Sequence, residues 1–164
     1  MYPMKNDHLS ASAQKVQASL TALGLDCHVV ELPGSTRTAE EAAQAIGCAA
    51  GQIVKSLVLV GKKSKRTFLV LASGPNRVDL AAIGVHVGEK VKMASAERVR
   101  QQTGFAVGGV PPLGHANPLP AYIDRCLIGY AEIWAAAGTP HAVFRLTPAD
   151  LVRMTNGEVI DIVG

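Results

Sequence analysis

Lys55 is the first residue that could carry out chemistry, because it interrupts an apolar run. Residues 53–60 read IVKSLVLV between Gly51 and Gly61, a pattern that predicts a strand buried on much of both faces. An ammonium group in such a strand is costly unless something negative is paired with it or bound to it. Lys55 therefore indicates either a site for a negatively charged group or a side chain that extends along a strand edge to reach water.

A segment rich in glycine and proline is the second candidate. Residues 104–120 read GFAVGGVPPLGHANPLP, which is irregular but long for a plain connector, and long loops often carry function. Its centre is the run Gly108, Gly109, Val110, Pro111 and Pro112. The glycines let backbone N–H groups approach a ligand closely, and the prolines stiffen the loop. These amides could hold a carbonyl oxygen as it gains negative charge, or the loop could merely turn the chain at the surface.

A third feature is the run from Gly138 to His141, which reads GTPH and predicts a turn that leads into a strand. His141 could orient a ligand at this turn. A histidine at a strand end is also often simply solvated, so both interpretations stay open.

A basic turn joins two expected strands and contains Lys62, Lys63, Lys65 and Arg66. It could contact the phosphates of a nucleic acid. The alternative is a solvated hairpin tip whose charges prevent aggregation.

Several familiar catalytic patterns are missing from the sequence. There is no GxSxG, GxxxxGK[ST] or GxGxxG motif, which argues against a standard α/β-hydrolase and against the common nucleotide cradles. The histidines are far apart and form no HExxH motif; they are His8, His28, His86, His115 and His141. No metal and no cofactor are therefore expected.

The cysteines and the N-terminus predict a cytoplasmic protein. Cys27, Cys48 and Cys126 are scattered and contain no CxxC pair, so a reducing compartment is expected and a disulfide framework is not. The start, MYPMKNDHLS, has no apolar stretch typical of a signal peptide, and no apolar run reaches membrane-spanning length.

The composition predicts a single domain over residues 1–164. Hydrophobic residues make up 48% of the chain and charged residues 18%, so a packed core is expected. Aromatic residues make up only 4%, which leaves few rings to stack on bases. The net charge of +3 is compatible with a polyanionic partner without requiring one.

Caps, glycines and apolar spacing predict how helices and strands alternate. Helices are expected from Ser10 to Gly24, from Thr38 to Gly47, from Val78, from Ser95 to Gln102 and after Thr147. Strands are expected at 29–30, 53–60, 67–71, 121–136, 142–146 and 159–163. There is no regular βαβ alternation. The predicted fold class is α+β, with a mixed, mainly antiparallel, barrel-like sheet and helices packed outside.

Taken in order, these segments resemble one family, the YbaK/prolyl-tRNA-synthetase-associated editing domains. The resemblance rests on TAEEAAQAIG (38–47), GQIVKSLVLV (51–60), NRVDL (76–80), TGFAVGGVPPLGH (103–115), YIDRCL (122–127) and the segment 136–162. It spans nearly the whole chain from about residue 30. No single motif is diagnostic, but their joint order and spacing make chance agreement improbable.

The resemblance implies a free-standing deacylase that hydrolyses the ester between a wrong amino acid and the tRNA 3′ end, commonly on tRNA(Pro). It implies that Lys55 is the functionally critical lysine and that Gly108–Pro112 is the GxxxP loop of the family. Gly108 and Gly109 are then expected to act with Lys55 in catalysis. Substrate binding is expected at Val110, Pro111, Pro112, Gly138 and His141. The expected partners are the tRNA 3′ end and prolyl-tRNA synthetase, with no membrane partner.

Two other functions stay open at this point. The first is a non-catalytic tRNA- or synthetase-binding module that kept the fold and lost the reaction. The second is a hydrolase for another small ester or amide, with which the modest net charge is compatible.

Overall fold

The computed structural model describes residues 9–163, so His8 and most of the N-terminal segment considered for a signal peptide lie outside the described residues. The helices are α1 (Ala11–Ala22), α2 (Ala39–Ile46), the 3-10 helix η1 (Ala50–Gln52), α3 (Leu80–Val87), α4 (Ala96–Thr103), α5 (Arg125–Ile128) and α6 (Pro148–Thr155). The strands are β1 (Val29–Glu31), β2 (Ile53–Gly61), β3 (Thr67–Ser73), β4 (Val91–Met93), β5 (Ala121–Asp124), β6 (Ile133–Ala136), β7 (Ala142–Leu146) and β8 (Glu158–Ile160).

Side-chain caps begin the helices where the sequence predicts them. The Ser10 hydroxyl accepts a hydrogen bond from the Ala13 N–H at the start of α1, and the Thr38 hydroxyl accepts one from Glu41 at the start of α2. These bonds satisfy donors that the first helical turn leaves free. The helix expected from Val78 starts slightly later, because the Asp79 carboxylate caps α3.

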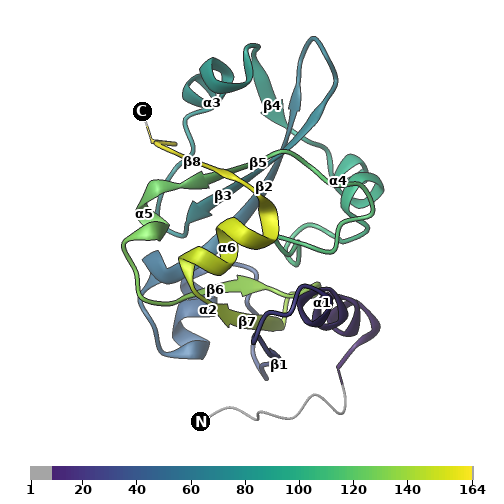
Figure 1. The fold of residues 1–164 in the computed structure, drawn as a ribbon, viewed down its shortest axis with the longest axis vertical. Helices are drawn as coiled ribbons and strands as arrows, with labels where there is room; N and C mark the ends of the chain where they lie inside the picture. The colour runs from purple at the N-terminus through teal and green to yellow at the C-terminus, as the bar shows by residue number, and fades with distance from the viewer. Residues whose placement is uncertain (1–8, 164) are drawn as a thin grey trace.

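The strands form one eight-stranded mixed sheet in the order β1-β7-β6-β2-β3-β5-β8, with β4 paired to β2 (Figure 1). Antiparallel pairing joins β1 to β7, β6 to β7, and β2 to both β3 and β4. Parallel pairing joins β2 to β6, β3 to β5 and β5 to β8. The predicted α+β class with a mixed sheet is confirmed; the sheet remains open and does not close into a barrel.

The central strand β2 is paired unevenly along its two edges. On one edge it pairs with β3 from Val54 to Val60. On the other edge it pairs with β6 only at Ile53 and Val54, and with β4 only from Leu59 to Gly61. No strand in the described part of the chain pairs with the intervening residues on that edge, so the sheet has a gap beside 55–57.

Three apolar clusters pack around the sheet. The largest joins α1, α6 and several strands, and Val54, Val58 and Val110 belong to it. A second cluster, beneath α3 and β4, contains Leu59; a third, beneath α2, contains Ile53. Because side chains alternate along a strand, Lys55 shares the face of Ile53 and Leu59 and lies between those two clusters. This placement explains how a lysine fits into an otherwise apolar strand.

Three short elements depart from the sequence-based expectations. The strand β8 ends at Ile160, whereas the expected strand ran over 159–163. The stretch 121–136, expected to be strand, contains the four-residue helix α5 between β5 and β6, because Asp124 caps it through the Cys126 N–H. The three-residue strand β4 was not predicted. Within residues 9–163, no helix combines the length and the apolar character needed to cross a membrane.

Candidate active site

A cavity of about 500 Å³ lies at the gap in the β2 edge. This volume is within the range of small-ligand sites, about 300–1,000 Å³. Its wall is formed by 53–57 of β2, 134–136 of β6, most of 36–42 at the start of α2, the turn after β3 and residues 107, 108 and 110. The fold therefore brings Lys55 and part of the Gly108–Pro112 loop to one cavity, although more than 50 positions separate them in the chain.

Lys55 is half-buried in the cavity wall and is held by two backbone carbonyls. Its Nζ donates to Asn76 O at 2.8 Å and to Gly74 O at 3.3 Å. An ammonium group has three N–H donors, and these carbonyls accept two of them. No carboxylate of residues 9–163 forms an ion pair with it. The positive charge is therefore positioned by neutral groups and is available to a negative ligand.

A buried carboxylate holds the turn that supplies these carbonyls. Asp124, only 2% exposed, accepts hydrogen bonds from the Asn76 side chain at 2.8 Å and from the Ser73 N–H at 2.9 Å. Its other oxygen accepts from the Cys126 N–H at 2.9 Å. Asp124 thus lies behind Asn76, which in turn contacts Lys55. Sequence reasoning missed this role; an acid before a short helix suggests a cap, but nothing local indicates its long-range partner.

The Gly108–Pro112 loop contributes only part of its length to the cavity. Gly108, with φ +95°, and the buried Val110 lie in the wall. Gly109 is buried against the turn at 138–139: its carbonyl accepts from the Gly138 N–H at 2.9 Å, and its own N–H donates to Ala106 O at 3.1 Å. The Gly109 amide would have to break this bond before it could contact a ligand.

The two prolines of the loop lie away from this cavity. Pro112 lines a separate hollow of about 370 Å³, together with His115. The Pro111 carbonyl accepts a hydrogen bond from His115 Nε2 at 2.6 Å. Burial lowers the pKa of His115 below its ordinary 6.5, and Lys15 adds to this effect, while the bond to Pro111 opposes it. The neutral His115 with hydrogen on Nε2 thus fixes the loop next to Gly108 and Val110.

Gly138 and His141 lie outside the cavity wall and contact residues next to it. Gly138 has φ +97°, and a Cβ there would lie 2.9 Å from Ser12 O. His141 is exposed, and its Nδ1 lies 3.0 Å from Gly34 O. Next to it, the Pro140 carbonyl accepts from both the N–H and the hydroxyl of Thr36, which lines the cavity. His141 is therefore linked to the segment 34–36 beside the cavity, and Gly138 is linked to Gly109 of the loop.

Sequence analysis did not single out the two arginines at the cavity. Arg37, just before α2, and Arg77, after β3, are exposed in its wall. Neither forms an ion pair within the described residues. Together with Lys55 they make the opening cationic, although Glu40 adds one negative charge to the wall. Such an opening suits a ligand that carries phosphate groups.

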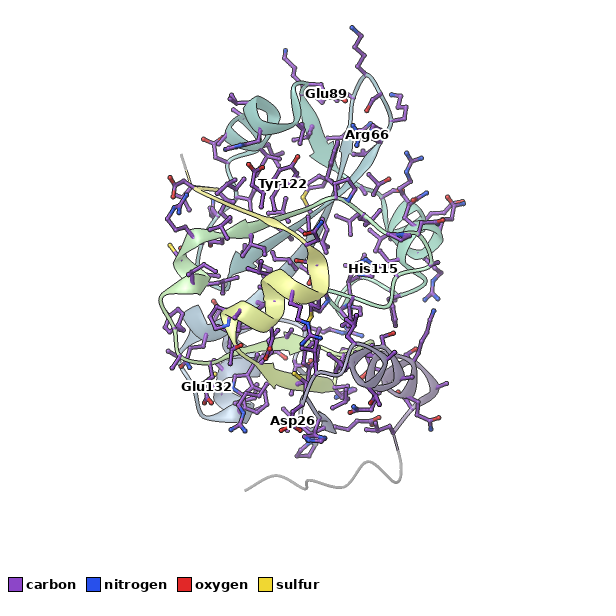
Figure 2. The ribbon with its side chains drawn as sticks, viewed as in Figure 1. Asp26, Arg66, Glu89, His115, Tyr122 and Glu132 are labelled. Atoms are coloured by element: carbon purple, nitrogen blue, oxygen red, sulfur yellow. The ribbon has the colours of Figure 1, made fainter. Side chains whose placement is uncertain are left out.

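The basic turn lies elsewhere. Figure 2 shows Arg66 and Glu89 near the tip of the β2–β3 hairpin, toward one end of the molecule, and Glu132, next to β6, toward the other. The Glu89 carboxylate accepts from the Lys63 and Ser64 N–H groups at 2.9 Å, and hydrogen bonding from Ser64 lowers the pKa of Glu89. The Arg66 guanidinium lies 5.3 Å from the Phe68 ring centre. The turn is thus an ordered part of the hairpin away from the cavity.

The described residues contain no group of three or more His, Cys, Asp or Glu side chains arranged to hold a metal ion. The cavity instead combines a held ammonium, two arginines, a glycine rim and an apolar wall that includes Trp134 and Val143. This arrangement can hold a phosphorylated ligand with a small apolar group and stabilise negative charge that develops beside Lys55.

Comparison with known proteins identifies the class to which this fold and site belong. Residues 34–154 match the aminoacyl-tRNA editing domain, and the chain belongs to this family. The resemblance predicted from the sequence is therefore confirmed.

Individual relatives are consistent with this assignment. A solved structure described as a candidate trans-editing enzyme for prolyl-tRNA synthetase superposes with a TM-score of 0.91 at 54% identity, covering 96% of this chain and 99% of the other. The chain is 31% identical over 152 residues to the uncharacterised protein YwhH of Bacillus subtilis, covering 92% of this chain and 96% of YwhH. It is 30% identical over 126 residues to EbsC of Enterococcus faecalis, a candidate Cys-tRNA(Pro)/Cys-tRNA(Cys) deacylase, covering 76% of each.

Proposed function

We propose that this chain hydrolyses the ester bond of mischarged aminoacyl-tRNA, acting in trans on tRNA(Pro) that carries a small wrong amino acid. The observation that carries the proposal is the Lys55 ammonium, held 2.8 Å from Asn76 O in the wall of a cavity whose rim includes Gly108. The editing family and the related candidate deacylases support the reaction class.

An aminoacyl ester is already reactive, so the protein needs to position water and stabilise charge rather than provide a strong nucleophile. The oxygen of a water molecule attacks the ester carbonyl carbon, and the carbonyl oxygen becomes negative. The bond from that carbon to the ribose oxygen then breaks, the ribose oxygen takes up the proton that the attacking water releases, and the free amino acid leaves. Lys55 stabilises the negative charge of the ester end or of the terminal phosphate. The loop at Gly108 closes the cavity around the acyl group.

The charges around the opening favour the tRNA 3′ end over a free ester. Arg37 and Arg77 flank the cavity and are unpaired among the described residues, so phosphates next to the terminal ribose can pair with them. The apolar wall at Trp134 and Val143 then surrounds the amino-acid side chain. A pocket of this kind rejects large side chains by clash, while one methylene changes binding by only about 1–3 kcal/mol. Prolyl-tRNA synthetase is the proposed partner, because it produces the mischarged substrate.

A deacylation panel tests the proposal. Purified protein is incubated with alanyl-, seryl-, threonyl- and cysteinyl-tRNA(Pro), with prolyl-tRNA(Pro) as the correctly charged control, and with a free aminoacyl ester. We expect hydrolysis of at least one mischarged tRNA and little hydrolysis of prolyl-tRNA(Pro). Binding without turnover would favour the non-catalytic module, and equal rates on the free ester would favour a general esterase.

A further inference from the structure

The gap beside β2 exposes the peptide group of one particular residue. On the β3 edge, Gly74 N donates to Ile53 O at 2.9 Å; on the opposite edge, Ala94 N donates to Val58 O at 2.9 Å. Consecutive residues of a strand turn their N–H and C=O groups to opposite edges. Ser56 lies two positions before Val58, so its N–H and C=O face the same edge as those of Val58. This is the edge with the gap.

Ser56 has no strand partner on that edge among the described residues. Pairing with β6 ends at Val54 and pairing with β4 begins at Leu59, while Ser56 itself lines the cavity. The Ser56 hydroxyl is also buried and has no hydrogen-bond partner in the described structure. Buried polar groups in proteins are nearly always paired, so Ser56 is a position where the protein itself leaves hydrogen-bonding groups open to a ligand.

An aminoacyl ester offers the matching groups. Its α-ammonium is a donor and its carbonyl oxygen an acceptor, placed on either side of one α-carbon as in a strand residue. In a hydrogen-bonded antiparallel pair, two facing residues exchange both bonds. We propose that Ser56 pairs with the aminoacyl group in this way: the Ser56 carbonyl accepts from the α-ammonium, and the Ser56 N–H donates to the ester carbonyl oxygen. This inference rests on the proposed function and specifies how that site recognises its substrate.

In this pairing, different parts of the cavity wall bind different parts of the substrate. The Ser56 N–H supplies a donor for the carbonyl oxygen as it becomes negative, whereas the Gly109 N–H is already bonded to Ala106 O. The backbone of β2 recognises the part common to all amino acids, and the apolar wall selects the side chain. Glu40 is the competing partner for the ammonium, because it is an acidic residue that also lines the cavity.

Substitution of Ser56 by proline removes the Ser56 N–H and tests its role independently of the fold. Proline is tolerated in a strand where its missing N–H faces no partner. We expect Ser56→Pro to keep the circular dichroism spectrum and to lose at least about 100-fold in deacylation rate, the cost of a lost oxyanion donor. Ser56→Ala keeps the N–H and should lose less than about tenfold. Leu57→Pro removes an N–H that faces β3 and should lower Tm sharply. If Ser56→Pro is folded and as active as Ser56→Ala, the pairing is wrong.

A binding measurement tests the pairing without turnover and without changing Ser56. The wild-type protein is titrated by calorimetry with 3′-alanylamino-3′-deoxyadenosine and with its lactyl counterpart, in which a hydroxyl replaces the ammonium. We expect at least about tenfold tighter binding of the alanyl compound, and the same preference in Glu40→Gln. Equal affinities, or a preference lost in Glu40→Gln, would overturn the pairing even if deacylation occurs. A preference kept by a protein that hydrolyses no aminoacyl-tRNA would support the pairing and refute the proposed function.

Discussion

The Lys55 ammonium donates to the Asn76 carbonyl oxygen at 2.8 Å, and the Asn76 side chain donates to the buried Asp124 carboxylate at the same distance. The charge in the cavity is thus positioned by a carboxylate that does not touch it. Neutral carbonyls hold the lysine in place without neutralising it, so its charge can act on a ligand.

This arrangement predicts that Asp124 acts through Lys55. Asp124→Asn replaces one of two accepting oxygens by a donor and should cost about 1–3 kcal/mol of unfolding free energy, measured by urea denaturation. It should also lower kcat more than it raises KM. In a Lys55→Ala background the same substitution should have little further effect on kcat, because coupled residues are not additive. Equal effects in both backgrounds would show that Asp124 is only structural.

Close packing of the Gly108–Pro112 loop predicts a steric effect at Gly109. A Cβ there would lie 2.8 Å from Thr139 N and 2.9 Å from Gly138 C, and these backbone atoms have little room to move. Gly109→Ala should therefore destabilise the protein by about 1–3 kcal/mol. Gly34→Ala is the matched control, because nothing lies within 4 Å of the added methyl. Indistinguishable urea midpoints for the two variants would contradict this packing.

His115 predicts a pH dependence of stability. Its folded pKa is below its ordinary 6.5, chiefly because of burial, so the unfolded chain binds the proton more strongly. The stability from the neutral ring is therefore fully present above pH 6.5 and is lost as pH falls from 6.5 through the folded pKa. Urea midpoints between pH 7.5 and 5 should fall less steeply for His115→Gln than for wild type. Equal slopes for His115→Gln and wild type would be inconsistent with the burial of His115.

The cysteines are expected to differ in reactivity. Burial, with added repulsion from Asp150 and Asp26, raises the pKa of the Cys27 thiol to about 11, while Cys126 is exposed. At pH 8 only about one Cys27 thiol in a thousand is then a thiolate, the form that reacts. Iodoacetamide should label Cys126 in the folded protein and Cys27 only after denaturation, as read by peptide mass spectrometry. Equal labelling of both in the native state would contradict the burial of Cys27.

The parts of the site that could be predicted from the sequence are those with a local signal. Lys55 interrupts an apolar strand, and residues 108–112 combine glycine with proline, so both are visible in short windows. Asp124 and Asn76 could not be paired in this way, because their hydrogen bond joins positions 48 residues apart. The significance of Ser56 depends on where β4 and β6 stop pairing with β2, and these end points are set by tertiary contacts that the sequence pattern does not reveal.

In the fold, too, the elements with a local sequence signal could be predicted and the others could not. Caps and glycines located α1, α2, α4 and α6 closely, because each has a side chain that satisfies its first free N–H groups. The helix α5 was missed because four residues give no periodicity. The Gly108–Pro112 loop was expected to act as one unit, yet Gly108 and Val110 line one cavity and Pro112 another. That division depends on tertiary contacts of the loop, which spacing alone does not reveal.

The most direct measurement is the single-turnover rate of deacylation for wild type, Lys55→Ala and Lys92→Ala with the best mischarged tRNA of the panel. Lys92 is an exposed lysine on β4 outside the cavity and serves as the control for loss of one positive charge. We predict that Lys55→Ala loses at least about 100-fold in rate with an unchanged Tm, while Lys92→Ala stays within about threefold of wild type. A folded Lys55→Ala variant that deacylates at the wild-type rate would contradict the central claim.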